Sequence, residues 1–216
     1  MTLQLDQLAV HLSGRDIVAL NASVAPGEVL TLMGPSGSGK STALAAVLGA
    51  LVPPFHVTGR VTLGGQDLTA LPTHQRRIGM MFQDDLLFPH LSVGGNLAFA
   101  LPATLRGQQA RRDKIDRALD EAGLTGFAAR DPATLSGGQR SRVALLRTLL
   151  AEPRALLLDE PFSRLDADLR AQIRRLVLDR AKTLRLPVVL VTHDAEDARA
   201  AGGRVLTPLG QEITLP

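Results

Sequence analysis

The sequence predicts an α/β fold with a mainly parallel sheet, an antiparallel β region and an inserted α-helical subdomain. Continuous apolar runs such as Val29–Met33 and Val188–Val191 are typical of parallel strands that are buried on both faces. Residues 1–83 and 154–216 are rich in such runs, separated by Gly and Pro, whereas residues 84–153 have helical patterns. We therefore expect one domain, 1–216, in which the strand-rich segments 1–83 and 154–216 enclose a helical subdomain at 84–153.

A glycine-rich loop follows the first of these runs and fits the pattern G-x-x-x-x-G-K-[ST]. It precedes a helix expected over Thr42–Val52, which Pro53 would stop. Backbone N–H groups of such a loop wrap a phosphate chain, Lys40 carries charge to the outer phosphates, and the Ser41 hydroxyl can bind Mg²⁺. The expected phosphate-binding residues are Gly34, Pro35, Ser36, Gly37, Ser38, Gly39, Lys40, Ser41 and Thr42.

Two acids end the apolar strand expected over 154–160. The carboxyl ends of parallel strands are where open α/β sheets bind ligands, so Asp159 is expected to hold Mg²⁺. Glu160 is the candidate general base for an attacking water. The alternative is that the two acids simply cap a helix in solvent.

The segment Leu135–Gln139 reads LSGGQ and leads into an expected helix. A Ser-Gly-Gly turn at a helix start offers a hydroxyl and free backbone N–H groups to a phosphate oxygen. We therefore expect Ser136, Gly137, Gly138 and Gln139 to contact nucleotide. A glycine-rich turn that only caps the helix is the alternative.

Composition narrows the class of protein. The 216 residues suffice for one sizeable core, and the absence of Cys excludes disulfides and thiolate metal sites. No run approaches the 18 apolar residues of a membrane span, and no signal peptide is evident. The net charge of +3 gives no reason to expect nucleic-acid binding.

The helical block contains one clearly amphipathic segment, Gly107–Ala122. Its apolar residues, Ile115 and Leu119 among them, recur on one face, and its basic residues lie largely elsewhere. We expect that basic cluster to be a solvated surface.

The order of these motifs resembles that of the nucleotide-binding subunit of ATP-binding cassette (ABC) transporters, over essentially the whole chain. The resemblance implies a P-loop NTPase core of ABC ATPase type. It also implies roles for Gln83, as a sensor of Mg²⁺ and of the attacking water, and for His193, as a γ-phosphate contact. The D-loop of the family matches 163–166, which adds Asp166 to the nucleotide site. From the residues alone, Gln83 and His193 are better explained as a surface residue and a helix-entry residue, and the resemblance reverses this preference.

The resemblance further implies a homodimer that closes on ATP. The catalytic residues would be Glu160, His193, Gln83 and Lys40, and the metal-binding residues Ser41, Gln83 and Asp159. The signature turn of one subunit would cap the γ-phosphate held by the other.

Two positions depart from the family pattern. The family stacks adenine on an aromatic residue ahead of the phosphate loop, yet no Tyr, Trp or Phe precedes Phe55. We expect His11 or Arg15 to stack, or Leu12 or Val18 to make apolar contact, with weak selectivity between ATP and GTP. In the D-loop, Arg164 replaces a residue that is usually small.

The segment Gln83–Val93 resembles that of importer ATPases for iron, thiamine, sulfate or spermidine. It implies that integral membrane permease subunits bind near this segment. A periplasmic or extracellular solute-binding protein would then be an indirect partner. From composition alone, core packing is the better explanation of Leu86 and its apolar neighbours, and the resemblance shifts the expectation toward a partner site. The implied location is the cytoplasmic face of the inner membrane, where the chain is peripheral. Since few residues follow His193, we expect no C-terminal regulatory domain.

Three other classes compete with a transport ATPase. A soluble ABC protein of translation or DNA repair usually has two cassettes or a long coiled coil, for which the interval Gln83–Ser136 is too short. Intact Lys40, Glu160 and His193 argue against a nucleotide-gated interaction module. A kinase would need an acceptor site, and no segment is reserved for one.

Overall fold

The computed structural model describes residues 1–163 and 165–215, and by its contacts the chain forms two compact units. The first contains residues 1–80, 154–160 and 176 to the C-terminus, and the second contains residues 81–153 and 161–175. The sequence expectation assigned 161–175 to the strand-rich part. These residues join the helical unit because the first half of α6 (Ala167–Thr183) packs there, with Leu169 against Gly138. The expectation for Arg164 lies outside the described residues.

The antiparallel sheet of the first unit has the strand order β2 (Arg15–Val24), β1 (Leu3–Leu12), β4 (His56–Leu63) and β5 (Gln66–Asp67). Along β2 and the start of β1, buried and exposed residues alternate. That alternation is expected of a sheet with one face on the core and one toward solvent. This sheet therefore covers one side of the first unit's core.

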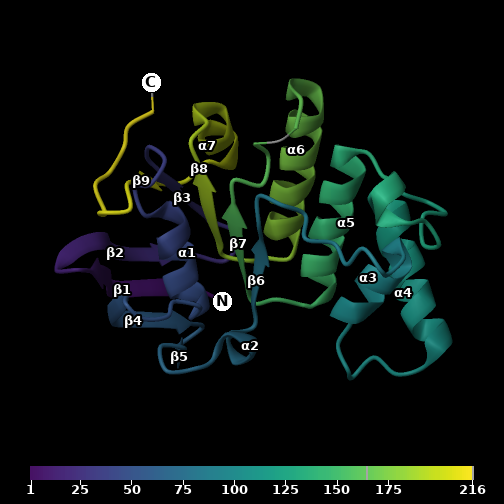
Figure 1. Cartoon of the computed structure of the whole chain (residues 1–216), viewed down its shortest axis with the longest axis horizontal. Helices are drawn as coiled ribbons and strands as arrows, with labels where there is room; N and C mark the ends of the chain where they lie inside the picture. The colour runs from purple at the N-terminus through teal and green to yellow at the C-terminus, as the bar shows by residue number, and fades with distance from the viewer. Residues whose placement is uncertain (164, 216) are drawn as a thin grey trace. The chain divides into compact units, whose positions relative to one another are not determined.

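The second sheet has the order β6 (Ile78–Met81), β7 (Ala155–Asp159), β8 (Val188–Thr192), β3 (Val29–Met33) and β9 (Val205–Leu206), as Figure 1 shows. The pairs that join β7, β8, β3 and β9 are all parallel. Their residues are almost all buried, which confirms the predicted parallel sheet with both faces covered. The phosphate loop and the acidic pair follow β3 and β7 at the carboxyl edge of this sheet.

Helix α1 (Lys40–Leu48) packs against strands of both sheets and ends four residues before the predicted Val52. Gly49 stops it, because its φ of +73° is a left-handed conformation that glycine adopts without strain. The buried guanidinium of Arg76 then donates to the carbonyls of Ala46 and Val47 in the last turn. The predicted stop at Pro53 was wrong because this capping was not evident from the sequence.

Two short helices complete the first unit, α2 (Thr73–Arg76) and α7 (Ala195–Ala201). A final strand was predicted around Ile213, but among the described residues only a single bridge between Leu206 and Glu212 forms there. The backbone N–H of Ile213 still donates to Val205, so this segment follows the edge strand without extending the ladder.

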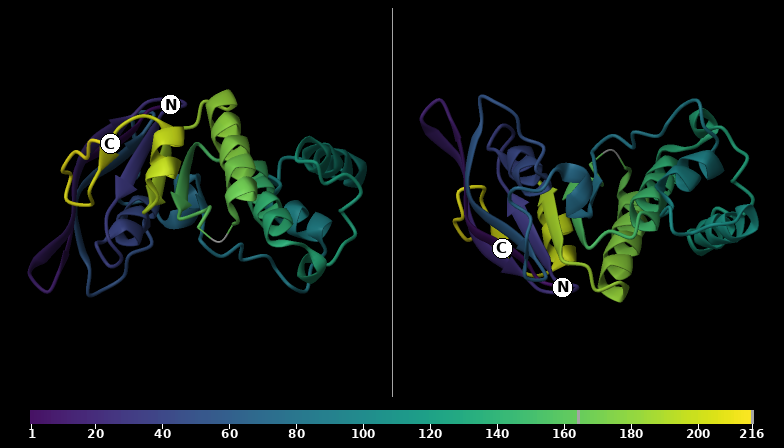
Figure 2. Two further views of the ribbon diagram at one scale, coloured as in Figure 1. Left: turned by 90° about the horizontal axis from the view of Figure 1, so that it is seen from above. Right: turned by 90° about the horizontal axis from the view of Figure 1, so that it is seen from below.

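The second unit is built from α3 (Val93–Ala100), α4 (Gln108–Glu121), the 3₁₀ turn η1 (Pro132–Thr134) and α5 (Gly137–Leu150). Figure 2 shows α3 and α4 gathered beside α5. Their shared core confirms the apolar face predicted for the amphipathic segment. Its buried residues include Val93, Leu97, Ile115, Leu119, Leu124 and Val143.

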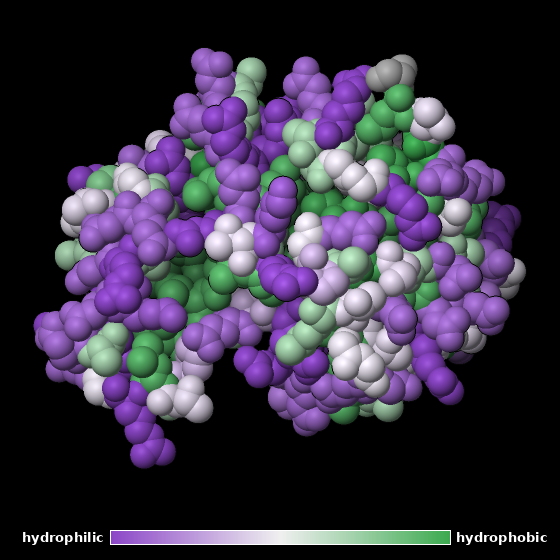
Figure 3. Space-filling view, turned by 180° about the vertical axis from the view of Figure 1, so that it is seen from behind, coloured by the Kyte–Doolittle hydropathy of each residue, from purple (hydrophilic) through white to green (hydrophobic). Residues whose placement is uncertain are grey.

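Hydrophilic side chains cover much of the face drawn in Figure 3, with smaller apolar areas between them. Several large apolar side chains are nevertheless exposed, among them Phe82, Leu86 and Phe99 of the helical unit. Within the described part of the chain, no helix has the length and apolar character needed to cross a membrane.

Candidate functional site

The phosphate loop connects the end of β3 to the start of α1 and has no room for side chains at two of its glycines. A Cβ on Gly39, where φ is +97°, would lie 2.7 Å from the carbonyl oxygen of Ile17. A Cβ on Gly34 would lie 2.7 Å from the Ser38 hydroxyl. The loop backbone is therefore held close to its surroundings, which leaves its N–H groups at the helix start for an anion.

Lys40 is the first residue of α1, and its side chain turns back over the loop. It is only 6% exposed, and its ammonium donates to the carbonyls of Gly34 (2.8 Å) and Pro35 (3.0 Å). These two partners are backbone carbonyl dipoles, which carry no full negative charge. A buried cation in this setting suits an anionic ligand, because burying a charge is costly unless it is paired.

A cavity of about 370 Å³ opens beside this loop, entirely within the first unit. Its lining combines loop backbone, hydroxyls, an ammonium and a carboxylate with three apolar side chains. The polar lining residues are Ser36, Gly37, Gly39, Lys40, Ser41, Thr42 and Glu160, and the apolar ones are Leu12, Ile17 and Phe55. The cavity thus suits a ligand that carries both phosphates and a flat, weakly polar group.

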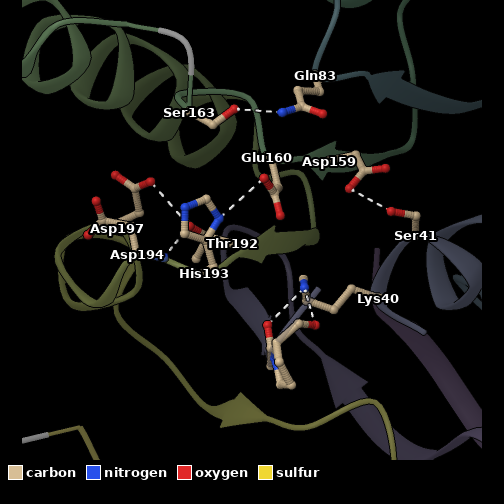
Figure 4. Close-up of polar contacts among 12 residues, drawn as sticks. Lys40, Ser41, Gln83, Asp159, Glu160, Ser163, Thr192, His193, Asp194 and Asp197 are labelled. Carbon is tan, nitrogen blue, oxygen red and sulfur yellow. Dashed lines mark hydrogen bonds and ion pairs between the residues drawn. The ribbon is translucent and has the colours of Figure 1, made fainter. Parts of the chain in front are cut away.

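Asp159 ends β7 and lies beside the start of α1, where its Oδ1 accepts a hydrogen bond of 3.1 Å from the Ser41 hydroxyl (Figure 4). Burial raises the pKa of Asp159, and the nearby charge of Glu160 adds to the rise, while the Ser41 hydrogen bond and Lys40 oppose it. A carboxylate and a hydroxyl side by side are ligands that Mg²⁺ accepts.

Glu160 has a φ of +46°, which is unusual for a residue with a side chain. Its backbone N–H donates to the carbonyl of Val191 in β8 (3.0 Å), which holds this conformation. Its Oε2 lies 3.2 Å from Nδ1 of His193 (Figure 4). Strained backbone of this kind persists where the surroundings fix it, as they do here, and it directs the carboxylate into the cavity.

His193 follows β8 and is held by its two neighbours in the chain. The Thr192 hydroxyl donates to the buried carboxylate of Asp197 (3.2 Å) and accepts from the backbone N–H of Asp194 (3.0 Å), as Figure 4 shows. Asp194 in turn caps α7 through the N–H of Glu196 (2.7 Å). The turn that presents His193 is therefore fixed on both sides, although its ring is largely exposed.

Gln83 and Asp166 belong to the helical unit. The side-chain amide of Gln83 donates to the Ser163 hydroxyl (3.3 Å), which links the glutamine loop to the D-loop segment. The carboxylate of Asp166 accepts from the N–H of Leu169 (3.0 Å) at the start of α6. Helix capping thus accounts for Asp166 within the subunit, whatever it contacts elsewhere.

The signature turn forms a complete capping box at the start of α5. The Ser136 hydroxyl accepts from the N–H of Gln139 (3.3 Å), and the Gln139 side chain accepts from the N–H of Ser136 (2.9 Å). Ser136 and Gly137 are exposed, whereas Gly138 is buried against Leu169. Because the Ser136 oxygen accepts, its own proton remains to donate, together with the N–H groups of the first helical turn.

The residues named for the base contact lie in different places. Leu12 lines the cavity, whereas Val18 lies in the core and His11 is paired with Asp16 at 2.6 Å. Phe55 also lines the cavity, although the sequence analysis did not name it as a candidate. The signal available was its position immediately before a strand that pairs with β1.

Comparison with known proteins adds to this geometry. The model of the ABC transporter family matches residues 17–163. The chain belongs to the ABC transporter family. It is an ATP-binding protein and an ATPase of that family, as the cavity and the arrangement of its motifs suggest.

Relatives of this ABC protein are similar over most of its length. An uncharacterized ABC transporter ATP-binding protein, YnjD, of Escherichia coli is 55% identical over 186 residues, which are 86% of this chain and 85% of that protein. The Fe(3+) ions import ATP-binding protein FbpC of Rhizobium etli is 42% identical over 90% of this chain. The putative 2-aminoethylphosphonate import ATP-binding protein PhnT of Salmonella choleraesuis is 40% identical over 93%. The chain spans 54% of the length of each of these two importer proteins.

Proposed function

We propose that this ABC protein is the ATP-hydrolysing subunit of a solute importer and that it works as a homodimer. The observation that carries the proposal is the contrast between a cavity lined by the phosphate loop and an exposed, preformed signature turn on the same chain. The importer relatives named above support the direction of transport. The chain would then act at the cytoplasmic face of the membrane, next to a permease and indirectly to a solute-binding protein.

In this proposal the first unit holds Mg²⁺ and ATP. Ser41 and Asp159 would hold the ion, with Gln83 completing the set, and the chemistry of their oxygen atoms fits it. Among the described residues no cluster of three or more His, Cys, Asp or Glu side chains exists that could hold a metal, so phosphate oxygens would supply further ligands. When bound, Mg²⁺ neutralises charge on the phosphate oxygens.

Hydrolysis requires a base and donors to the γ-phosphate. Glu160 would accept a proton from the water that attacks the γ-phosphorus, while the bond to the β-phosphate oxygen breaks and ADP leaves. Lys40 and His193 would donate to the γ-phosphate oxygens, where charge accumulates. The contact between Glu160 and His193 supports this, because it orients the base and brings both side chains to one place.

The γ-phosphate would be capped by the signature turn of the second subunit. Ser136 would donate its free proton, and Gly137 and Gly138 their backbone N–H groups, to a phosphate oxygen. Both subunits are identical, so two equivalent sites form in a two-fold dimer. Closure on ATP and opening after hydrolysis would move the attached permease.

Complementation between two inactive variants tests the shared site. Lys40→Ala damages the phosphate loop, and Ser136→Arg damages the signature turn, so each homodimer has two defective sites. A mixed dimer has one site with both defects and one intact site, so an equal mixture should recover about a quarter of wild-type phosphate release. If the mixture stays as inactive as its components, the shared site is wrong.

A permease contact near Gln83–Val93 is testable because the chain has no cysteine. Leu86 is 55% exposed in this segment, and Leu184 is 50% exposed elsewhere. We expect Leu86→Cys, but not Leu184→Cys, to cross-link to an integral membrane protein in membranes of cells that express the whole transporter. Equal cross-linking of both variants would contradict the proposed contact.

A further inference from the structure

The lining of the nucleotide cavity contains one aromatic ring. The apolar residues of this lining are Leu12, Ile17 and Phe55, and they line the same cavity as the loop residues proposed to bind phosphate. The chain has six Phe and neither Tyr nor Trp, so a ring at this place is notable. Flat aromatic bases stack on such rings, and each stacked base typically contributes on the order of 1–3 kcal/mol.

Phe55 is held in place by the elements on both sides of it. Its ring is partly buried and packs against the core of the first unit. The next residue, His56, begins β4 and pairs with His11 of β1, so the backbone at Phe55 is fixed beside the end of β1, and Phe55 and Leu12 line the same cavity. Figure 1 shows β1, β2 and β4 together beside α1. A ring held in this way loses little conformational freedom when a base stacks on it.

The other candidates for a base contact are engaged elsewhere or lie outside the cavity. Nδ1 of His11 is 2.6 Å from Asp16, and its Nε2 is 3.4 Å from the Thr58 hydroxyl, so both nitrogens face the antiparallel sheet. Val18 is fully buried in the core. Arg15 is exposed at the start of β2 and is not among the residues that line the cavity.

We propose that Phe55 is the residue on which the nucleotide base stacks, and that it sets a preference for purines without distinguishing adenine from guanine. The inference rests on the proposed ATP-binding site and adds to it a contact from the loop after α1. The stacking residue of the family usually precedes the phosphate loop in sequence, whereas Phe55 follows it. Discrimination between bases needs polar groups that read their edges. Apart from the loop residues and Glu160, the residues that line the cavity are apolar, namely Leu12, Ile17 and Phe55, so stacking area decides affinity.

Binding of ATP, GTP, CTP and tripolyphosphate to the full chain, measured by calorimetry, tests this inference. For the wild type we expect ATP and GTP to bind within about threefold of each other and CTP to bind about tenfold more weakly. Phe55→Leu should weaken ATP and GTP by about tenfold and leave tripolyphosphate unchanged, because it removes the ring alone. The matched control is Phe99→Leu, since Phe99 is 71% exposed in the helical unit. This variant should bind the nucleotides and tripolyphosphate with the affinities of the wild type.

A second variant separates stacking from a structural role. Because the chain has no Trp, Phe55→Trp creates a single fluorescent reporter that keeps an aromatic ring at this place. We expect it to bind ATP at least as well as the wild type, and its emission to change with ATP but not with tripolyphosphate. Phe99→Trp should not respond to either ligand.

The outcomes distinguish this inference from the proposed function. If Phe55→Leu binds ATP like the wild type, or if its affinities for ATP and for tripolyphosphate fall by the same factor, the inference is overturned and the ATPase proposal stands. A strong preference of the wild type for ATP over GTP would also overturn it, since that requires edge recognition. If the wild type binds neither ATP nor tripolyphosphate, the proposed function itself fails.

Discussion

The phosphate loop and the signature turn are both glycine-rich turns at the start of a helix, yet they are built differently. The phosphate loop lines a cavity of about 370 Å³ and brings a buried ammonium, Lys40, to it. The signature turn begins α5 with a closed capping box, and its Ser136 and Gly137 are exposed. Each offers helical N–H groups to an anion, but only the first surrounds it.

The difference explains why the same chain would need a second copy of itself. A phosphate held only by a few exposed N–H groups competes with water and gains little. The signature turn would therefore act only after a phosphate has been presented to it by another molecule. In the first unit, charge, cavity and hydroxyls are already assembled, so ATP capture would precede closure.

Glu160→Gln should separate these two events and give the largest effect. The substitution keeps the size of the side chain and removes the proposed base, so hydrolysis should fall by about 100-fold or more. ATP binding should persist, and ATP-bound dimers should accumulate when nucleotide is added, which light scattering would detect as an increase in molar mass. Ordinary turnover in this variant would refute the assignment of the base. Glu212→Gln, at an exposed position near the C-terminus, is the matched control and should behave like the wild type.

Arg76→Ala tests whether the unit that contains the phosphate loop depends on the hydrogen bonds from Arg76 to the last turn of α1. The guanidinium is 5% exposed and donates to four carbonyls, those of Ala46, Val47, Thr69 and Leu71. Burial lowers its pKa, and the charge of Asp67 opposes that shift. Removing it takes one donor from each of these carbonyls, although that of Ala46 keeps the N–H of Gly49 (3.1 Å), so we expect a loss of about 3 kcal/mol in the free energy of unfolding by urea.

The exposed Arg60→Ala is the control for that measurement. Arg60 is on the antiparallel sheet and pairs only loosely with Asp67, at 3.7 Å. We expect a change within about 0.5 kcal/mol. If both variants lose the same stability, the support of α1 by Arg76 is not specific.

Much of the parallel sheet and of the phosphate loop could be predicted because their signals are local. Val29–Met33 is apolar throughout, and a glycine-rich loop with Lys40 follows at once, so strand, loop and helix are encoded side by side. The capping box at Ser136 and Gln139 is local in the same way. Such features depend on residues within a few positions of each other.

Other features depend on residues far apart in the chain, and the sequence did not reveal them. The end of α1 is fixed by Arg76, which lies 30 positions beyond Ala46. Phe55 reaches the cavity only because β4 pairs with β1. The burial of Gly138 likewise needs Leu169 from another helix. Their partners come together only in the tertiary fold, so no local pattern indicates them.

The two glycines of the signature turn, Gly137 and Gly138, allow a sharper test of whether this turn binds a phosphate held by a second subunit. A Cβ on Gly138 would lie 2.3 Å from the Leu169 side chain, so Gly138→Ala should cost about 1–3 kcal/mol in the free energy of unfolding by urea. A Cβ on Gly137 meets only the end of the Arg140 side chain, at 4.0 Å. Gly137→Ala should therefore fold normally, yet lose ATP turnover, because in the proposed dimer its methyl group would face the phosphate held by the second subunit.

Equal turnover in Gly137→Ala and the wild type would argue against a phosphate at this turn. The result would be informative because the fold of that variant can be checked independently by urea unfolding. Recovery of turnover in a mixture with Lys40→Ala would further assign the defect to the signature side.

Asp159→Asn should have a small effect on stability, and in the opposite direction from its effect on activity. Burial raises the pKa of Asp159, so between the unfolded value, about 3.9, and the raised folded value the native state binds more protons than the unfolded state. Stability contributed by this group therefore falls as the pH rises through that interval and stays reduced above it. The asparagine cannot ionise and keeps an oxygen for Ser41, so with a chelator present it should be more stable than the wild type at neutral pH, by within about 1 kcal/mol. This gain should shrink toward pH 4, whereas Mg²⁺-dependent phosphate release should be lost throughout. A variant that is less stable at neutral pH would show that the charge of Asp159 supports the fold of the phosphate region instead of being a cost of its function.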